Sequence, residues 1–333
     1  MHTSRRLASS VAILCFFFPL VGAHSQVYTT IVAFGDSLSD TGNDANLSQA
    51  KYGLRIPGPI ANYTDGRFTD GVSTIPGSGT YNGTWVEQLA AQLPNHPAVV
   101  NSLNGGTNYA YGFAFTGSGS TNLVLTTNPF PLSITVNNIG LQISTYLATH
   151  PRIDNKTLFV LWGGANDVLN ATSATDIVNA ATNQSINVYK LLAAGATQII
   201  VPNLPPLGST PRLNGSTATS IPYNQAANYF NKTLAQGIAI IEGYFTGTHP
   251  AVYQFDVYSL FNQVIASPAT YGFTNVTASS QQQSVNPDQY LFWDSLHPTT
   301  HGHNIIANVA LQVLNAPPCN PAQTVCPGST VAH

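Results

Sequence analysis

Charged side chains are scarce in this sequence of 333 residues. Asp, Glu, Lys and Arg together make up 7% of the chain, whereas an ordinary globular protein carries about 25%. So few charges exclude a long coiled coil and a charge-driven disordered protein. The net charge of −3 also argues against a nucleic-acid binder, which needs a basic face. Because hydrophobic residues reach 43%, the chain can still build a sizeable core.

Cysteine is scarce as well, with three in the whole chain. Cys15 lies in an apolar N-terminal segment, and Cys319 and Cys326 stand seven apart in a proline-rich stretch near the C-terminus. In an oxidising compartment, we expect this last pair to form a local disulfide that secures residues 317–333. Two cysteines alone do not suggest a metal site. A catalytic cysteine is not indicated either, because no histidine partner is placed near them in sequence.

No apolar run is long enough to cross a bilayer, which needs about 20 residues. The run at residues 11–21 follows Arg5 and Arg6 and ends in small residues, which is the pattern of a secretory signal peptide. We therefore expect residues 1–25 to be a signal, cleaved after Ala23 or Ser25, and the mature protein to be secreted and extracellular, without stable membrane insertion. A buried N-terminal helix is the less favoured alternative.

Sequons for N-glycosylation are frequent in the chain. They begin at Asn46, Asn62, Asn82, Asn155, Asn170, Asn183, Asn214, Asn231 and Asn275. Several lie beside predicted elements, where a glycan would be exposed. N-linked glycans would solubilise a surface that has little charge, so the sequence predicts a secreted glycoprotein.

Short β-branched runs alternate with longer helical patterns, which predicts βαβ units and a parallel sheet. The expected strands are Tyr28–Phe34, Ala98–Asn101, Thr157–Trp162, Gln198–Pro202 and Val252–Phe255, and the expected helices are Trp85–Leu93, Val136–Thr149, Ala174–Ala194, Tyr223–Phe245 and His301–Asn315. Gln49–Tyr81 and Gly117–Ser133 are expected to be long loops that wall a substrate cleft. The pattern favours one α/β domain over residues 26–316, a three-layer α/β/α arrangement with a central parallel sheet of about five strands.

The third expected helix carries a stripe of core residues. The residues placed near one face are Ile177, Ala181, Ile186, Tyr189, Leu192 and Ala193.

Ser37 follows the first expected strand directly, in the stretch Gly35-Asp36-Ser37. In an open parallel sheet, ligands bind beyond the carboxyl ends of the strands, so Ser37 is placed where a nucleophile would be useful. The competing interpretation is a helix N-cap, because Ser, Asp and Thr often have only that role after a strand.

Asn166 follows the third expected strand in the same way, after the pair Gly163-Gly164. Its amide could donate to an oxyanion, or it could stabilise a cap or a turn. Gly105–Gly119 is also rich in glycine, which lets backbone N–H groups approach a substrate closely, although a plain turn explains this stretch better when it is taken alone.

Asp294 and His297 are three residues apart, so one turn could hold both on one face. A carboxylate beside an imidazole fixes its tautomer and stabilises the imidazolium, as a general base that activates a serine requires. The competing interpretation is a metal site formed by His297, His301 and His303. No second carboxylate or cysteine cluster supports that site, and we expect His301 and His303 at the surface of the last helix.

Together these segments resemble the blocks of the GDSL esterase/lipase family, also called SGNH hydrolases. Phe34–Asn43 is similar to the family's first block, Asn108–Gly112 to its second, Gly164–Asp167 to its GxND block and Asp294–Pro298 to its last, while Gly66–Gly71, Trp85–Ala90 and Asp256–Phe273 resemble stretches between them. The resemblance extends over most of the mature chain.

The resemblance implies a flavodoxin-like SGNH hydrolase fold with Ser37 as nucleophile, His297 as general base and Asp294 orienting His297. It further implies an oxyanion hole formed by the N–H of Ser37, a backbone N–H at Gly112 and the side chain of Asn166. The second block departs from the family at Phe113, where members often carry a second glycine. This leaves open whether Phe113 narrows the pocket.

The sequence thus predicts a secreted serine esterase that hydrolyses short-acyl, acetyl esters of carbohydrates, without a metal or organic cofactor. Tyr63, Tyr81, Trp85, Tyr109 and Tyr111 are candidates for a sugar-stacking cleft, or for packing. No basic amphipathic segment favours a membrane-docking phospholipase. A lipase or phospholipase acting on longer acyl chains is the alternative enzyme. A non-catalytic glycan-binding or cell-wall protein is the alternative of another class.

Overall fold

The computed structural model describes residues 27–75, 79–126, 131–245, 247 and 250–316. The predicted signal peptide (residues 1–25), the C-terminal segment 317–333 and the predicted Cys319–Cys326 disulfide lie outside the described residues, so these three stay predictions. In the described part of the chain, no helix has the length and apolar character that a membrane span requires.

The centre of the molecule is a parallel sheet in the order β1-β6-β7-β8. Its strands are β1 (Thr30–Gly35), β6 (Thr157–Trp162), β7 (Gln198–Pro202) and β8 (Ala251–Phe255). Each residue of β6 is buried, in keeping with its continuous apolar sequence TLFVLW. The carboxyl ends of β1 and β6 coincide, because Gly35 pairs with Trp162.

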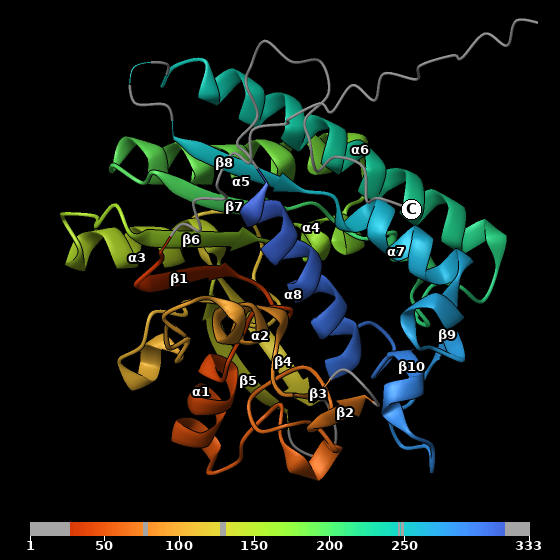
Figure 1. The fold of residues 1–333 in the computed structure, drawn as a ribbon. Helices are drawn as coiled ribbons and strands as arrows, with labels where there is room; N and C mark the ends of the chain where they lie inside the picture. The colour runs from red at the N-terminus through yellow and green to blue at the C-terminus, as the bar shows by residue number, and fades with distance from the viewer. Residues whose placement is uncertain (1–26, 76–78, 127–130, 246, 248–249, 317–333) are drawn as a thin grey trace, which may run out of the picture.

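Helices cover both faces of this sheet (Figure 1). α3 (Ile139–Thr149), α5 (Ala174–Ala193) and α6 (Thr217–Glu242) pack on one face. α2 (Trp85–Gln92), α7 (Val257–Ala266) and α8 (Thr300–Asn315) pack on the other. The strands send alternate side chains to the two faces, so the sheet separates two apolar cores and the three-layer α/β/α prediction is confirmed.

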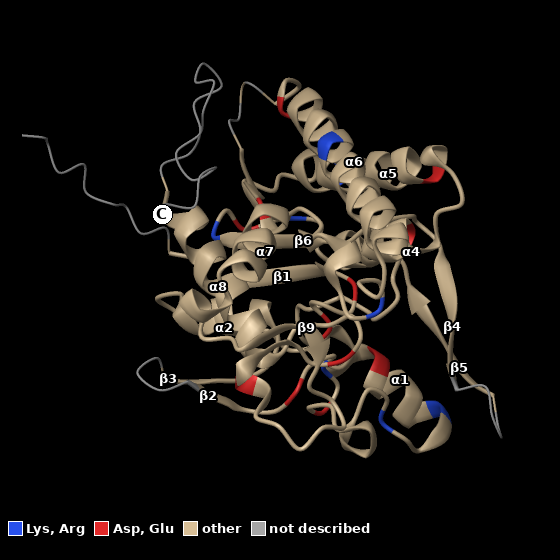
Figure 2. Ribbon diagram, turned by 90° about the vertical axis from the view of Figure 1, so that its right-hand side faces the viewer, with Lys and Arg blue, Asp and Glu red and all other residues tan. Residues whose placement is uncertain are grey.

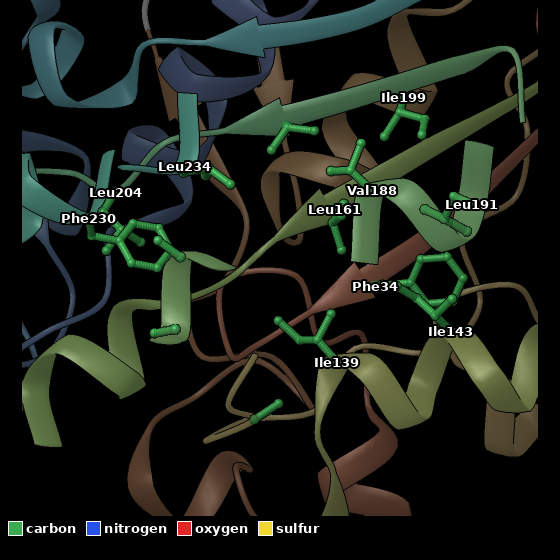
Figure 3. Close-up of a cluster of buried hydrophobic side chains, with 14 of the residues drawn as sticks. Phe34, Ile139, Ile143, Leu161, Val188, Leu191, Ile199, Leu204, Phe230 and Leu234 are labelled. Carbon is green, nitrogen blue, oxygen red and sulfur yellow. The ribbon is translucent and has the colours of Figure 1, made fainter. Parts of the chain in front are cut away.

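The first core shows how the alternation works (Figure 3). Phe34 of β1, Leu161 of β6 and Ile199 of β7 face Ile143 of α3 and Val188 of α5. All five side chains are fully buried. Burying such side chains stabilises the fold by roughly 1.5–3 kcal/mol each. This packing holds β1 and β6 in place, and polar residues follow at the carboxyl ends of both strands.

The sheet has four strands rather than the five expected, because Ala98–Asn101 does not form a strand. Residues 107–111 lie along the outer edge of β1 instead. The N–H of Tyr109 donates to the carbonyl of Ala33 at 2.7 Å, and the N–H of Ala33 donates to the carbonyl of Thr107 at 3.1 Å. Asn108 forms single bridges to Ala33 and Asn101. Residues 107–111 therefore bond to the edge of β1 without forming a regular strand.

The two segments expected to be long loops contain regular structure. Gln49–Tyr81 begins inside α1 (Asn43–Tyr52) and includes β2 (Ser73–Ile75) and β3 (Gly79–Tyr81), while Gly117–Ser133 contains β4 (Ser120–Thr126) and reaches β5 (Leu132–Asn137). β4 and β5 form an antiparallel hairpin, so α3 begins at Ile139 instead of Val136.

The remaining elements are short. α4 spans Ala165–Asn170, and β9 (Asn275–Ser279) pairs with β10 (Tyr290–Phe292). Single 3-10 turns occur at Pro59–Ala61, Ser102–Asn104, Leu207–Ser209, Pro268–Tyr271 and Pro287–Gln289.

The predicted core stripe of α5 is only half right. Ile177, Ala181 and Leu192 are buried, but Ile186 and Tyr189 are 44% and 47% exposed. The buried face instead includes the polar side chains of Gln184, Ser185 and Asn187. Ile186 lies nine residues from Ile177, which at 3.6 residues per turn puts it on the opposite side of the helix, so the apolar face runs through Val188 and Leu191 instead. On the buried face, the amide of Asn187 donates to the carbonyl of Thr116 at 2.9 Å.

Charged residues are sparse over the ribbon (Figure 2). Arg67 pairs with Glu87 at 2.6 Å, and Arg55 pairs with Asp65. Both pairs involve the segment between α1 and α2, so the few ion pairs tie this irregular segment to itself and to α2.

Candidate active site

Ser37 lies in a tight turn directly beyond β1. The carbonyl of Asp36 accepts the N–H groups of Ser39 and Asp40 at 3.0 Å each, and the Asp36 carboxylate accepts the N–H of Leu38 at 3.1 Å. Gly35 is required here, because a Cβ at that position would lie 2.4 Å from the carbonyl oxygen of Trp162. The strand therefore ends close against β6 and presents Ser37 at the carboxyl edge of the sheet.

Asp294 and His297 lie in the loop between β10 and α8. Oδ1 of Asp294 accepts the backbone N–H groups of Leu296 and His297, each at 2.7 Å. Oδ2 of Asp294 lies 2.7 Å from Nδ1 of His297. The three-residue spacing thus does what the sequence predicted, because one turn fixes both side chains and aligns them.

Burial alone would raise the pKa of Asp294. The neighbouring His297, through its charge and its side-chain and backbone hydrogen bonds, outweighs that effect, and the Tyr63 hydroxyl adds to it. The pKa of Asp294 is therefore held well below its usual range, and the carboxylate stays ionised at neutral pH. An ionised carboxylate at Nδ1 keeps the imidazole proton on that nitrogen and leaves Nε2 free to accept a proton.

His297 in turn reaches Ser37. Nε2 of His297 lies 2.8 Å from Oγ of Ser37, and Ser37, Asp294 and His297 are all buried. The ring of Phe68 lies against the imidazole with the centroids 5.0 Å apart. Serine, histidine and aspartate thus form one hydrogen-bonded series, which can deprotonate a serine hydroxyl during attack on a carbonyl.

Asn166 lies at the carboxyl end of β6, at the start of α4. Its Nδ2 donates to the carbonyl of Ala114 at 3.1 Å, which fixes the direction of the amide. Gly164 takes a φ of 113° and leaves no room for a Cβ, which would lie 2.3 Å from the ring of Phe230. The glycine turn brings Asn166 to the same cavity as Ser37 and His297.

Gly112 is not among the residues that line this cavity. A Cβ at Gly112 would lie 2.4 Å from Oδ2 of Asp44 and 2.5 Å from the ring of Phe68. Its backbone N–H lowers the pKa of Asp40 and of Asp44, two buried carboxyl groups, against the larger effect of burial. Gly112 thus lies against Asp44 and Phe68, and its place in an oxyanion hole stays a prediction.

Phe113 does not line the cavity either. Its φ of 60° lies in the left-handed region that favours glycine, and its side chain is 44% exposed. A glycine would adopt this backbone conformation without strain, so the conformation is compatible with the second glycine of the family block that this stretch resembles. The bulky side chain lies at the surface instead of in the cavity.

The cavity beside Ser37 and His297 is narrow, with a volume of about 30 Å³. Its walls come from the ends of β6 and β10, from α7 and from the loops after β7 and β10, and they include Trp162, Leu207, Phe261, Phe292, Leu296 and Pro298. The space lies directly beside Ser37 and His297, where the acyl part of an ester bonded to Ser37 would be placed. The walls are mainly apolar, and no Lys or Arg is among the lining residues.

His301 and His303 are buried, which makes the expectation of surface positions wrong. Nδ1 of His301 lies 2.7 Å from the carbonyl of Asp288, and Nδ1 of His303 accepts the N–H of Trp85 at 3.2 Å. Burial, followed by the charge of His297, lowers the pKa of His303 to about 3, so its imidazole is neutral. The contact of His303 with Trp85 ties the first turn of α8 to α2, while His301 contacts the turn at Pro287–Gln289. The described residues contain no cluster of three or more His, Cys, Asp or Glu side chains that could hold a metal ion.

Two contacts at this site could not be found by sequence reasoning. The hydroxyl of Tyr63 donates to Oδ2 of Asp294 at 2.6 Å, and Phe68 covers His297. The one signal in the sequence was the stretch Gly66–Gly71 that resembles the family, which contains Phe68 and begins three residues after Tyr63. Among the other aromatic candidates for a sugar-stacking cleft, Trp85 and Tyr111 are buried in the interior.

Asp36 is a third buried group at the site. It lines the cavity, and burial raises its pKa to about 6, with the nearby charge of His297 acting in the opposite direction. Asp167 also has a pKa raised by burial to about 6, and its carboxylate accepts the hydroxyl of Thr116 at 2.8 Å. The sequence singled out the segments that hold these carboxylates but gave them no role.

Comparison with known proteins agrees with these motifs. A family model described as GDSL-like lipase/acylhydrolase matches residues 31–310. Lipase 1 of Photorhabdus luminescens is 26% identical over 89% of this chain and 51% of its own length, so the chain spans about half of that lipase. GDSL esterase/lipase 6 of Arabidopsis thaliana is 28% identical over 92% of this chain and 93% of its own. Among solved structures, the acetylxylan esterase Axe2 of Geobacillus stearothermophilus matches 87% of this chain and 96% of its own, with 14% identity and a TM-score of 0.41.

Proposed function

Because the chain belongs to the GDSL-like lipase/acylhydrolase family, we propose that it hydrolyses carboxylic esters through an acyl-enzyme formed on Ser37. The observation that carries this proposal is the hydrogen-bonded series from Ser37 Oγ to His297 Nε2 at 2.8 Å and from His297 Nδ1 to Asp294 Oδ2 at 2.7 Å. A buried serine linked in this order to an imidazole and an ionised carboxylate has the arrangement that nucleophilic catalysis needs.

In this reaction His297 takes the proton of Ser37 as the Oγ atom bonds to the ester carbonyl carbon. The tetrahedral intermediate then collapses, and the alcohol leaves with the proton from His297. Water repeats the sequence on the acyl-enzyme, and the carboxylic acid leaves. Asp294 stays ionised throughout and stabilises the imidazolium, which the depressed pKa of its carboxyl supports.

The negative oxygen of the intermediate needs hydrogen-bond donors. We assign this role to the backbone N–H of Ser37, to Nδ2 of Asn166 and, as the family resemblance implies, to the N–H of Gly112. Asn166 has stronger support than Gly112, because it lines the same cavity as Ser37 and because its hydrogen bond to the carbonyl of Ala114 fixes the direction of its amide. One such donor typically stabilises the transition state by about 2.7–4 kcal/mol.

The narrow cavity supports a short acyl group. The cavity is small and lies directly beside Ser37 and His297, which favours a short acyl group such as acetyl. We therefore propose acetyl esters as substrates. A carbohydrate as the alcohol part agrees with the low charge of the chain, and the absence of Lys and Arg among the lining residues does not favour a phosphate headgroup.

We further propose that the protein is secreted and carries N-linked glycans on exposed sequons. Asn62, Asn82 and Asn155 are exposed. Asn231 is 9% exposed, and its side chain bonds to both the N–H and the carbonyl of Leu204, at 2.8 and 2.9 Å. An N-linked glycan is attached at Nδ2, the buried atom that donates to Leu204, so peptide mapping of the secreted protein should find sugar at the exposed sites and none at Asn231.

The experiment that tests the proposed activity is hydrolysis of p-nitrophenyl esters from acetate to palmitate. We expect turnover of the shortest esters and a loss of roughly 10⁴-fold or more in Ser37→Ala, because the covalent route is removed. Rates that rise with the length of the acyl chain would contradict the proposed acetylesterase activity and favour a lipase. A folded protein without activity on any ester would favour the non-catalytic glycan-binding or cell-wall protein.

A further inference from the structure

The carboxylate of Asp294 accepts one hydrogen bond from outside its own loop. The hydroxyl of Tyr63 donates to Oδ2 at 2.6 Å across 231 residues of sequence. The same oxygen lies 2.7 Å from Nδ1 of His297, while Oδ1 accepts the N–H groups of Leu296 and His297. A carboxylate has about four lone-pair sites, so these donors fill them all. Removal of Tyr63 would therefore free one position on the oxygen that holds the imidazole.

The phenol of Tyr63 is held in place on several sides. Its backbone N–H donates to the carbonyl of Gly58 at 3.2 Å. Its ring lies edge-on to Trp293, with centroids 6.4 Å apart, and to Phe68, with centroids 6.2 Å apart. Phe68 also lies against His297. The segment between α1 and α2 therefore fixes the hydroxyl and covers the imidazole at the same time.

The hydroxyl remains a donor over the working pH range. Burial and then the charge of Asp294 raise the pKa of Tyr63 above its usual value. A protonated phenol withdraws negative charge from the carboxylate oxygen to which it donates. A carboxylate with less charge on that oxygen stabilises the imidazolium less.

We propose that Tyr63 is a positioning residue, which holds Oδ2 of Asp294 against Nδ1 of His297 and so controls how strongly this carboxylate stabilises the imidazolium that forms when His297 accepts the proton of Ser37. The inference rests on the proposed ester hydrolysis. It gives the segment between α1 and α2 a direct effect on the reaction, although that segment contributes none of the proposed reacting groups.

Other charged or titratable groups also face His297. Asp36 acts on it from the end of β1, His303 acts on it from α8, and Asp294 contacts it directly. Tyr63→Phe leaves all three in place and removes only the hydroxyl. A change in the pH dependence of this variant is therefore attributable to the lost hydrogen bond.

The test compares Tyr63→Phe with Tyr52→Phe on p-nitrophenyl acetate. Tyr52 is a matched control, because it is also half-buried and its hydroxyl donates to the carbonyl of Ser133 at 2.7 Å. We expect kcat of Tyr63→Phe to fall about tenfold, as for loss of a hydrogen bond to a charged group, with KM nearly unchanged. The acid limb of its kcat/KM profile should move to higher pH by about half a unit, while Tyr52→Phe keeps the wild-type profile.

A proton NMR readout does not depend on activity. We expect the low-field resonance of the proton on Nδ1 of His297, identified by its loss in His297→Gln, to move in Tyr63→Phe and to stay in Tyr52→Phe. An acid limb and a resonance that both match the wild type in folded Tyr63→Phe would overturn the proposal, as would a loss confined to KM. A wild-type protein that hydrolyses no ester would refute the proposed function, and the resonance would still decide whether Tyr63 controls the Asp294–His297 contact.

Discussion

Nε2 of His297 lies 2.8 Å from Oγ of Ser37, although 260 residues separate the two in sequence. The contact forms because β1 ends close against β6 at Gly35, where no side chain would fit, and because one turn of the Asp294–His297 loop aims the imidazole at that edge. Glycine at the strand end and three-residue spacing in the loop are thus the two sequence features that assemble the site.

Asn166→Ala should lower turnover of p-nitrophenyl acetate by roughly 10²–10³-fold, because it removes one donor to the developing oxyanion. KM should change little, since the bond forms mainly in the transition state. Asn179→Ala is a suitable control, because Asn179 is an exposed asparagine of α5 that does not belong to a sequon. Near-normal turnover in Asn166→Ala would remove this residue from the site.

Leu296→Ala should widen the cavity and relax the preference for short acyl groups. Leu296 is a half-buried wall residue, so its truncation should leave the fold intact, and its backbone N–H can still donate to Asp294. One methylene in an apolar pocket is worth about 10-fold or more in specificity, so we expect the ratio of kcat/KM for butyrate over acetate to rise by at least about tenfold. Leu54→Ala, an exposed leucine remote from the lining residues, is the control. An unchanged ratio would mean that this cavity does not hold the acyl group.

Asp44→Asn should make the protein more stable at neutral and alkaline pH. Burial and the neighbouring Asp40 raise the pKa of Asp44 well above its usual value of 3.8. The folded state therefore binds the proton more tightly than the unfolded state, so this group contributes most stability below pH 3.8 and loses it as pH rises toward its folded pKa. Asn mimics the neutral carboxyl and removes the loss.

We expect the Tm of Asp44→Asn to exceed that of the wild type by about 2–4 °C at pH 8, the shift that about 1 kcal/mol produces in a domain of this size. The difference should shrink at pH 4, where the wild-type carboxyl is protonated. Exposed Asp154 provides the control variant Asp154→Asn, which should show no such pH-dependent gain. A gain of equal size at both pH values, or a loss at pH 8, would contradict this account.

The central strands were predictable because continuous apolar runs in the local sequence indicate buried strands. Thr157–Trp162 is a continuous apolar run and forms a fully buried strand with the predicted bounds. Ser37, Asn166, Asp294 and His297 were also predictable, because each follows a strand end or shares a turn. What the local pattern could not show is which of two neighbouring segments pairs with β1, and residues 107–111 take the place expected for Ala98–Asn101.

Polar residues account for most of the remaining differences. His301 and His303 have the sequence of an exposed first turn, yet the carbonyl of Asp288 and the N–H of Trp85 hold them inside. The contact of Tyr63 with Asp294 joins segments 231 residues apart and leaves no periodic signal. Such hydrogen bonds depend on tertiary geometry, which no window of local sequence contains.

Labelling with a fluorophosphonate tests the central claim most directly. The reagent phosphonylates a serine only where a base activates its hydroxyl and the site admits a tetrahedral centre. We predict one adduct per chain, mapped by mass spectrometry to Ser37 and lost in His297→Gln. An unlabelled folded protein, or an adduct on another serine, would contradict the assignment of Ser37 as the nucleophile.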